Sequence, residues 1–265
     1  MDRDQLYNNQ IHYELFSQNS EKDLIVLVHP LGMNHRVWQE SIKALESQYD
    51  VLVLDLPGHG ESLAVTEESW TIPSLADMIR ELVFSLGYSK VHYVGTSIGG
   101  AIGQELLLSN PEFLQSLMVT NTSYQIGTKE SWTVRANDVR NYGIKKMAAG
   151  IVPRWFAPEY ISENRDKVEE WQNSLAESDN EGYAVLCEAL GNWSATTRLE
   201  VLESQVPVLA VAGDKDPAMP LENMKELASL LKAPLEILDL GHVPSVEDPK
   251  AFNELLLNWL EKSKS

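Results

Sequence analysis

The sequence predicts an α/β protein in which a mostly parallel sheet has helices on both faces. Short apolar runs typical of buried strands alternate with longer segments of helical periodicity up to residue 121 and again from residue 204. Residues 122–203 have helical periodicity but no convincing strand. We therefore expect a core domain formed by residues 1–121 and 204–265, with residues 122–203 inserted into it as a helical cap.

The strands of this core are predicted from their hydrophobic patterns. Residues 11–16 alternate between polar and apolar side chains, which is typical of a strand at or near the edge of a sheet. The central runs are continuously apolar, as in strands that are covered on both faces. The remaining predicted strands lie at residues 24–29, 51–55, 91–94, 117–121, 206–213 and 235–240.

Helical periodicity fills the segments between these runs. In the core we expect helices at residues 37–48, 72–86, 98–109, 221–231 and from 249 onward. In the cap we expect them at residues 132–141, 142–151, 158–174 and 181–190. Strands and helices that alternate in this way form parallel sheets, whose strand ends meet at a single edge.

Charge and cysteine content narrow the range of functions. The net charge of −18 argues against binding to nucleic acid or to an anionic membrane surface, because both require basic patches. Cys187 is the one cysteine of the sequence, so neither an intrachain disulfide nor a thiolate metal cluster can form. The first residues lack the apolar core of a signal peptide, and no apolar run approaches ~18 residues. We expect a cytoplasmic protein whose partner is a small molecule.

The segment Gly95-Thr96-Ser97-Ile98-Gly99 lies between a predicted strand and a predicted helix. In that context the pattern Gly-x-Ser-x-Gly predicts a sharp turn that presents the serine hydroxyl at the end of the sheet. The two glycines leave room where a side chain would collide with neighbouring elements. Free N–H groups and the positive dipole end of the following helix lie at the same place. Ser97 is therefore the candidate nucleophile.

Other predicted strands also end in reactive residue types. Asp216 follows the strand-like run that ends at Gly213, and His242 follows the last run. Ligands gather at the carboxyl ends of parallel strands, so these side chains are expected near Ser97. A serine, an acid and a histidine are the parts of a nucleophilic triad, and Ser-Asp-His is the chain order expected of this topology.

Several residues compete for these roles. Asp214 is the alternative acid. His29 and His59 also lie in segments that follow strands, but their positions favour bracing of the loops over proton transfer. Asp55 is expected to order its own loop and not to act in catalysis.

Five motifs agree in order and spacing with one known family. They lie at residues 29–32, 55–62, 95–100, 213–220 and 241–242. Over essentially its whole length the sequence resembles the α/β hydrolases. The resemblance implies an eight-stranded type of sheet, and its spacing from Gly213 favours Asp216 as the acid. It also implies that Ser97 is the nucleophile, that His242 is the base, and that the backbone N–H groups of Leu31 and Ile98 form the oxyanion hole.

Within this family the chain is most similar to 3-oxoadipate enol-lactonases and related carboxylesterases. The similar segments are residues 29–34 with Trp38, residues 154–158 and residues 182–190, whereas Pro57 stands where enol-lactonases usually carry arginine. The resemblance implies hydrolysis of an ester or lactone of a small carboxylic acid through an acyl-enzyme. Short-chain carboxylesterase and C–C bond hydrolase are alternatives on the same triad. A non-catalytic small-molecule receptor is an alternative of another class.

The predicted cap carries the candidate substrate-binding residues. Trp132 and Trp155 either line an apolar pocket or belong to the core of the cap itself. Arg135 and Arg154 either bind a substrate carboxylate or lie on a solvated face. We expect no metal site, because the sequence lacks paired ligand spacings such as His-Glu-x-x-His, and no cofactor, because no Gly-x-Gly-x-x-Gly follows the first strand.

Overall fold

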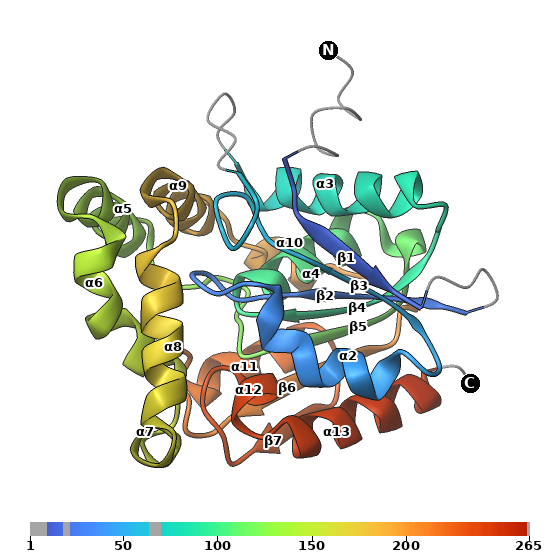
Figure 1. The fold of residues 1–265 in the computed structure, drawn as a ribbon. Helices are drawn as coiled ribbons and strands as arrows, with labels where there is room; N and C mark the ends of the chain where they lie inside the picture. Colours follow the sequence, from blue (N-terminus) through green and yellow to red (C-terminus); the bar gives the residue numbers. More distant parts are fainter. Residues whose placement is uncertain (1–9, 18–21, 64–69, 264–265) are drawn as a thin grey trace.

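The computed structural model describes residues 10–17, 22–63 and 70–263 (Figure 1). Its strands form one sheet in the order β1-β3-β2-β4-β5-β6-β7, in which β1 pairs antiparallel with β3 and every other neighbouring pair is parallel. The strands are β1 Tyr13–Phe16, β2 Leu24–Val28, β3 Asp50–Leu54, β4 Val91–Thr96, β5 Leu114–Thr120, β6 Val208–Gly213 and β7 Leu235–Leu238. The predicted α/β fold with a mostly parallel sheet is confirmed.

The number of strands differs from the family expectation. The described residues contain seven strands, whereas the resemblance implies eight. Each of the seven strands coincides with one of the hydrophobic runs in the sequence. The expectation of an eighth strand therefore came from the family resemblance and not from the hydrophobic patterns. The central strands β2, β3, β4 and β6 are buried along their whole length, while the edge strands β1 and β7 are partly exposed.

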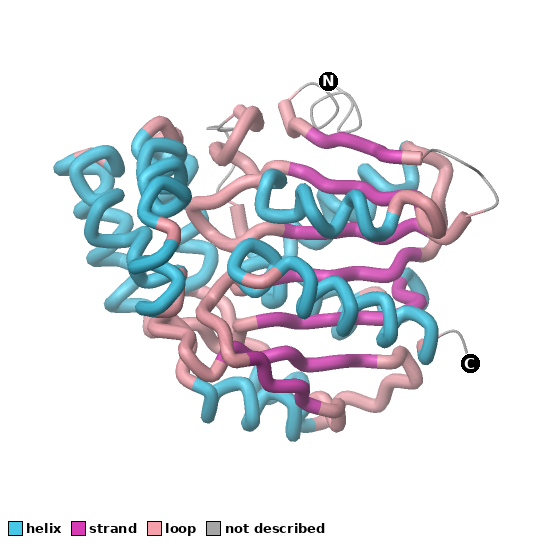
Figure 2. Tube along the Cα trace, turned by 60° about the horizontal axis from the view of Figure 1, so that its bottom comes forward, coloured by secondary structure: helices cyan, strands magenta, loops and turns pink. Residues whose placement is uncertain are grey.

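Helices cover both faces of the sheet (Figures 1 and 2). Helices α2 and α13 pack together on one face, and α3 and α4 pack together on the other. Helix α11 contacts β6 and β7. The helices of the core are η1 His35–Trp38, α2 Gln39–Leu45, α3 Ile72–Ser85, α4 Ile98–Ser109, η2 Pro111–Phe113, α11 Leu221–Leu230, α12 Pro244–Glu247 and α13 Pro249–Lys262.

The segment between β5 and β6, which the structure describes in full, contains helices and no strand. These helices are α5 Lys129–Tyr142, α6 Ile144–Ile151, η3 Val152–Trp155, α7 Pro158–Glu163, α8 Arg165–Ala176, α9 Asn180–Gly191 and α10 Thr196–Glu200. Helices α5 to α9 gather at the end of the sheet to which the carboxyl ends of the parallel strands point, whereas α10 lies beside α4 (Figure 1). The exact division of the chain at residues 122 and 203 stays a prediction.

One predicted helix of this insert is broken. Residues 158–174 form two helices, α7 and α8, with Asn164 between them. The φ of −126° and ψ of 44° at Asn164 are not helical, and its side-chain amide donates to the carbonyl of Tyr160 at 3.1 Å. Asparagine competes for backbone hydrogen bonds in this way, which explains why hydrophobic periodicity alone did not indicate the break.

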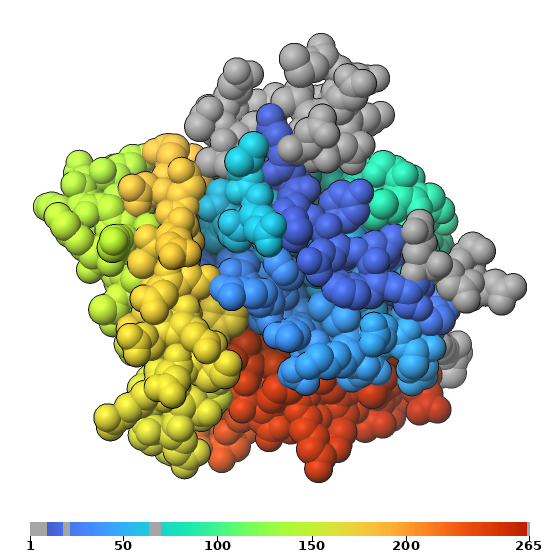
Figure 3. Space-filling model, in the orientation of Figure 1, coloured from blue at the N-terminus to red at the C-terminus, as the bar shows by residue number. Residues whose placement is uncertain are grey.

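The helical insert is in direct contact with the core (Figure 3). The Ser174 hydroxyl on α8 accepts hydrogen bonds from the side chains of Asn34 and Arg36, at 3.1 and 3.0 Å. A Cβ atom on Gly58, whose φ is +70°, would lie 2.4 Å from the Cα of Gly182 on α9. The loop after β3 and the insert therefore approach so closely that glycine is needed at this contact. None of the described helices combines the length and apolarity needed to cross a bilayer.

Candidate active site

The turn between β4 and α4 holds Ser97 in a strained conformation. Its φ of 57° and ψ of −116° lie in a region that residues other than glycine rarely adopt. The backbone is fixed on both sides, because the Ser97 N–H donates to Thr120 O at 3.0 Å and the Thr122 hydroxyl donates to Ser97 O at 2.8 Å. Such strain, maintained by surrounding contacts, is a frequent property of functional sites.

Both glycines of the predicted motif are required by close backbone contacts. A Cβ atom on Gly95 would lie 2.2 Å from the carbonyl oxygen of Gly99, and one on Gly99 would lie 2.4 Å from that of Val28. The first contact is within the turn itself, and the second packs the start of α4 against β2. The motif therefore has the mechanical role expected from the sequence.

His242 and Asp216 form a buried pair beside this turn. The His242 Nδ1 lies 2.7 Å from Asp216 Oδ2, and their side chains are 5% and 1% exposed. A carboxylate can only accept, so Nδ1 carries the proton and Nε2 keeps its lone pair. The second carboxylate oxygen, Oδ1, accepts the N–H groups of Ala218 and Met219 at 2.7 and 2.9 Å. Of the two candidate acids, Asp216 is the one that contacts the histidine, while Asp214 is exposed.

Asn121, at the end of β5, supports this pair and was not found by sequence reasoning. Its side-chain amide donates to Asp216 Oδ2 at 2.8 Å and to the carbonyl of Gly241 at 3.1 Å. Its φ of 46° is a further left-handed conformation at a strand end. The sequence carries no carboxylate at this strand end. The one signal that could have indicated Asn121 is its position directly after a predicted strand.

Glu247 is a second supporting residue that the sequence did not reveal. Its Oε2 accepts the N–H of Gly241 at 3.0 Å and that of Ala157, in the insert, at 3.3 Å. Burial, reinforced by the negative charge of Asp216, raises the pKa of Glu247 to about 7 despite those hydrogen bonds. One carboxyl group thus connects the histidine loop to the insert.

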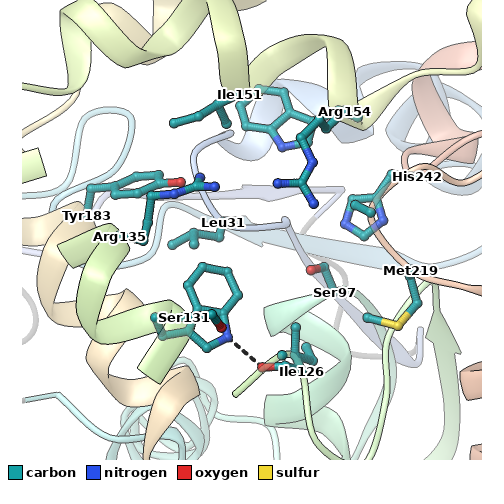
Figure 4. Close-up of a pocket in the computed structure, with 14 residues that line it drawn as sticks. Leu31, Ser97, Ile126, Ser131, Arg135, Ile151, Arg154, Tyr183, Met219 and His242 are labelled. Carbon is teal, nitrogen blue, oxygen red and sulfur yellow. Dashed lines mark hydrogen bonds between the residues drawn. The ribbon is translucent and has the colours of Figure 1, made fainter. Parts of the chain in front are cut away.

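A cavity of about 230 Å³ opens over Ser97 and His242 (Figure 4). All four residues expected from the predicted cap line it, namely Trp132, Arg135, Arg154 and Trp155. Its other lining residues include Leu31, Ile126, Ile151, Tyr183 and Met219, which are apolar or aromatic. The cavity therefore has apolar walls, two cationic groups, and the serine and histidine at its base.

The two arginines of the cavity differ from Arg140 and Arg198, which form salt bridges. Arg140 pairs with Glu181 and Glu188, and Arg198 pairs with Glu105. Within the described residues, Arg135 and Arg154 make no salt bridge, although the sequence contains 39 acidic residues against 21 lysines and arginines. Figure 4 shows Arg154 reaching toward the space above Ser97 and Arg135 beside Tyr183. Their charges are available to a ligand.

The four tryptophans of the insert fall into two groups. Trp132 and Trp155 line the cavity, and the backbone carbonyl of Trp155 accepts the N–H of His242 at 3.1 Å. Trp171 instead lies under the guanidinium of Arg36, 5.5 Å from its ring centre, and the indole N–H of Trp193 donates to Glu105 at 2.9 Å. The first pair faces the cavity, whereas the second attaches the insert to the core.

The expected oxyanion donors are the N–H groups of Leu31 and Ile98, and Ile98 directly follows the serine. Leu31 lines the cavity, and Ile98 is the first residue of α4. In the described part of the chain, neither backbone N–H donates a hydrogen bond. Two unpaired donors beside a serine and a helix N-terminus are suited to stabilise a negative charge that develops on a substrate oxygen.

His29 and His59 are fully buried and hold loops, as their positions suggested. His29 Nε2 accepts the N–H of Leu56 at 2.9 Å, so its Nδ1 donates to the carbonyl of Pro30 at 2.8 Å. Burial lowers the pKa of His29 and lowers that of His59 to about 4. Neither histidine is among the residues that line the cavity.

Comparisons with known proteins agree with this geometry. A sequence profile of the alpha/beta hydrolase fold matches residues 23–145. A 3-oxoadipate enol-lactonase of Acinetobacter baylyi is 32% identical over 92% of this chain and 90% of its own length. The chain belongs to the α/β-hydrolase family. It is a hydrolase, and hydrolysis of ester-type bonds is the activity that this membership supports.

Two further relatives of this α/β hydrolase indicate how similar chains vary. A putative carbamate hydrolase, RutD, of Pantoea ananatis is 30% identical and covers 95% of this chain and 93% of its own. The crystal structure of an enol-lactonase from Burkholderia xenovorans LB400 superimposes with a TM-score of 0.90 at 27% identity, over 96% of this chain and 98% of that chain. The fold, insert included, is thus shared along nearly the whole length.

Proposed function

We propose that this α/β hydrolase cleaves the ester or lactone bond of a small substrate that bears a free carboxylate, through an acyl-enzyme on Ser97. The observation that carries the proposal is the presence of two arginines without a salt bridge, Arg135 and Arg154, in the cavity of Ser97 and His242. A guanidinium binds a carboxylate through two parallel hydrogen bonds. The small volume of the cavity, about 230 Å³, favours a short acyl group.

The first chemical step is attack of Ser97 Oγ on the substrate carbonyl carbon. His242 Nε2 takes the hydroxyl proton, and Asp216 stabilises the resulting imidazolium through the 2.7 Å contact with Nδ1. The negative charge on the carbonyl oxygen is held by the N–H groups of Leu31 and Ile98. The carbon–oxygen bond then breaks, and His242 gives its proton to the leaving oxygen.

The second step releases the acid. Water attacks the acyl-enzyme while His242 accepts one of its protons, and the ester bond to Ser97 Oγ breaks with return of that proton. In a lactone the leaving oxygen remains attached to the acyl chain, so ring opening yields one product with one additional carboxyl group. Arg135 and Arg154 hold the carboxylate that does not react.

The names of the relatives favour a lactone substrate. Two curated relatives from Acinetobacter baylyi, 32% and 28% identical, are 3-oxoadipate enol-lactonases. The substrate named for them is a lactone that keeps a free carboxylate, which fits a cavity with two available guanidinium groups. A general short-chain carboxylesterase on the same triad is the second candidate, and it is favoured if a neutral ester is cleaved as well as a charged one.

The decisive experiment compares two esters that differ only in a carboxylate. We expect the mono-p-nitrophenyl ester of glutaric acid to be cleaved with at least tenfold higher kcat/KM than p-nitrophenyl butyrate. Arg154→Gln should lower kcat/KM for the acidic ester about 10- to 100-fold and leave the butyrate within about twofold, because only the acidic ester uses the charged hydrogen bonds.

Arg140→Gln is the matched control. Arg140 lies on α5, like Arg135, but pairs with glutamates on the surface of the insert. It should leave both rates unchanged. Equal rates for the two esters in the wild type, or equal losses for both in Arg154→Gln, would reject carboxylate recognition and favour the carboxylesterase.

A further inference from the structure

A second aspartate–histidine pair lies outside the cavity of Ser97. The Nδ1 of His35, on η1, is 2.9 Å from Oδ1 of Asp55, at the end of β3, and the Asp55 side chain is fully buried. Because the carboxylate accepts, the Nδ1 carries the proton and Nε2 is left as the ring nitrogen with a free lone pair. A carboxylate that orients an imidazole in this way is the arrangement found behind metal-binding histidines.

His12 and Glu14 face this imidazole from the edge strand. They are two residues apart on β1 and its extension, so their side chains lie on the same face. One ligand atom from each of His12, Glu14 and His35 lies within 4.8 Å of the others. His12 Nε2 is shielded from solvent and has no hydrogen-bond partner, and it lies 3.7 Å from Glu14 Oε1.

The distances are compatible with one tetrahedral ion. The ring centres of His12 and His35 are 5.1 Å apart. Two imidazoles on one zinc ion, with Zn–N distances of about 2.0–2.1 Å, have ring centres about 5 Å apart and ligand atoms about 3.3 Å apart. Small rotations of His12 and Glu14 would therefore complete three protein ligands, and water would supply the fourth.

Asp55 also holds the backbone of these residues in place. The Asp55 N–H donates to His12 O at 2.9 Å, and its carboxylate accepts the His35 N–H at 2.7 Å. The His12 N–H donates to the hydroxyl of Ser62 at 2.8 Å. A further carboxylate, Glu61, lies 3.8 Å from His12 Nδ1 and would orient that ring as Asp55 orients His35. The site is preorganised, with negative charge around two imidazoles.

We propose that His12, Glu14 and His35 bind a divalent transition-metal ion of the zinc type. Nitrogen and carboxylate ligands together suit Zn²⁺ and disfavour Ca²⁺ and Mg²⁺, which prefer oxygen ligands alone. The ion joins the edge strand β1 to η1, which begins four residues after Leu31. It therefore stabilises the segment that carries the oxyanion donor and takes no part in bond cleavage.

Titration of the full-length, chelator-treated protein with zinc chloride, followed by calorimetry, tests this site. We expect one zinc ion per chain, and a rise in Tm of about 5 °C at saturation. Glu14→Gln should weaken binding at least tenfold, and His12→Gln and His35→Gln about 100-fold or more. The Glu14 side chain is 42% exposed. We therefore expect Glu14→Gln to keep its fold even if one of the histidine variants does not.

His242→Gln is the matched control, since it removes the other aspartate-paired histidine. His242→Gln should bind zinc as the wild type does. When Co²⁺ is bound in place of zinc, its visible absorption should be retained in His242→Gln and lost in His12→Gln. Absence of zinc binding by the wild type overturns the proposal. Unchanged affinity in Glu14→Gln and His12→Gln, or loss of binding in His242→Gln, overturns it as well.

Discussion

The protein contains two buried aspartate–histidine pairs that have the same local geometry and different surroundings. In each pair a histidine Nδ1 lies close to a shielded carboxylate oxygen, at 2.7 Å for His242 and Asp216 and at 2.9 Å for His35 and Asp55. In both, the carboxylate also accepts backbone N–H groups. The difference is what lies beyond the ring. His242 lines the cavity of Ser97, whereas His35 faces His12 and Glu14.

This contrast shows that the pair by itself does not define a catalytic site. A carboxylate fixes the tautomer and orientation of an imidazole, and the group that meets the free nitrogen determines the chemistry. A strained serine hydroxyl beside two unpaired N–H groups favours acyl transfer. A second imidazole and a carboxylate favour a cation.

The largest expected effect is on kcat, and it distinguishes His242 from His35. His242→Gln should lower kcat for any cleaved ester at least ~10³-fold, as should Ser97→Ala, because each removes a member of the proposed triad. His35→Gln should leave kcat within about threefold. Steady-state kinetics on p-nitrophenyl esters measure this. If His35→Gln lost as much activity as His242→Gln, the two pairs would not have separate roles.

The second-largest expected effect distinguishes Asp216 from Asp214, the two aspartates that follow β6. Asp216→Asn should lower kcat about 10²- to 10⁴-fold, because the amide no longer fixes the required tautomer of His242. Asp214→Asn, an isosteric change two residues away at an exposed position, should stay within about twofold of the wild type. Equal losses of kcat in these two variants would contradict the assignment of Asp216 as the acid that orients His242. Thermal melts of both proteins exclude unfolding as the cause.

The smallest effect concerns Glu247, which is behind the His242 loop. Its ordinary pKa of 4.5 rises to about 7 on folding, so the folded state binds this proton more tightly than the unfolded chain does. The carboxyl group therefore costs stability progressively as the pH rises from about 4.5 to 7. In Glu247→Gln this loss should be absent, and the variant should gain on the order of 2 kcal/mol relative to the wild type between about pH 5 and pH 8.

Urea unfolding at several pH values measures this difference. Glu254→Gln, on the exposed side of α13, is the control and should run parallel to the wild type. Parallel curves for Glu247→Gln would show that Glu247 is already ionised across this range, and that its contact with Gly241 and Ala157 does not depend on protonation.

Sequence patterns were sufficient for those features that depend on short stretches of chain. The buried strands β2, β3, β4 and β6 were indicated by mainly apolar runs, because a strand that is covered on both faces has few polar positions. The serine turn was indicated by two glycines, whose absent side chains leave room for Gly99 O and Val28 O. Features within one turn or one strand are encoded by neighbouring residues, so they can be read from the sequence.

Contacts between distant segments required the tertiary structure. Asn121 meets Asp216 across 95 positions and Glu247 meets Ala157 across 90, so no local spacing indicated either contact. The expectation of no metal site considered paired ligands at short spacing, whereas the proposed ligands His12 and His35 lie just before β1 and on η1. The sequence alone thus determined the fold class and the position of the serine turn, through local sterics and hydrophobic periodicity. Only the folded chain decided which ring nitrogen faces which partner, because side chains from separate elements converge only after the sheet has formed.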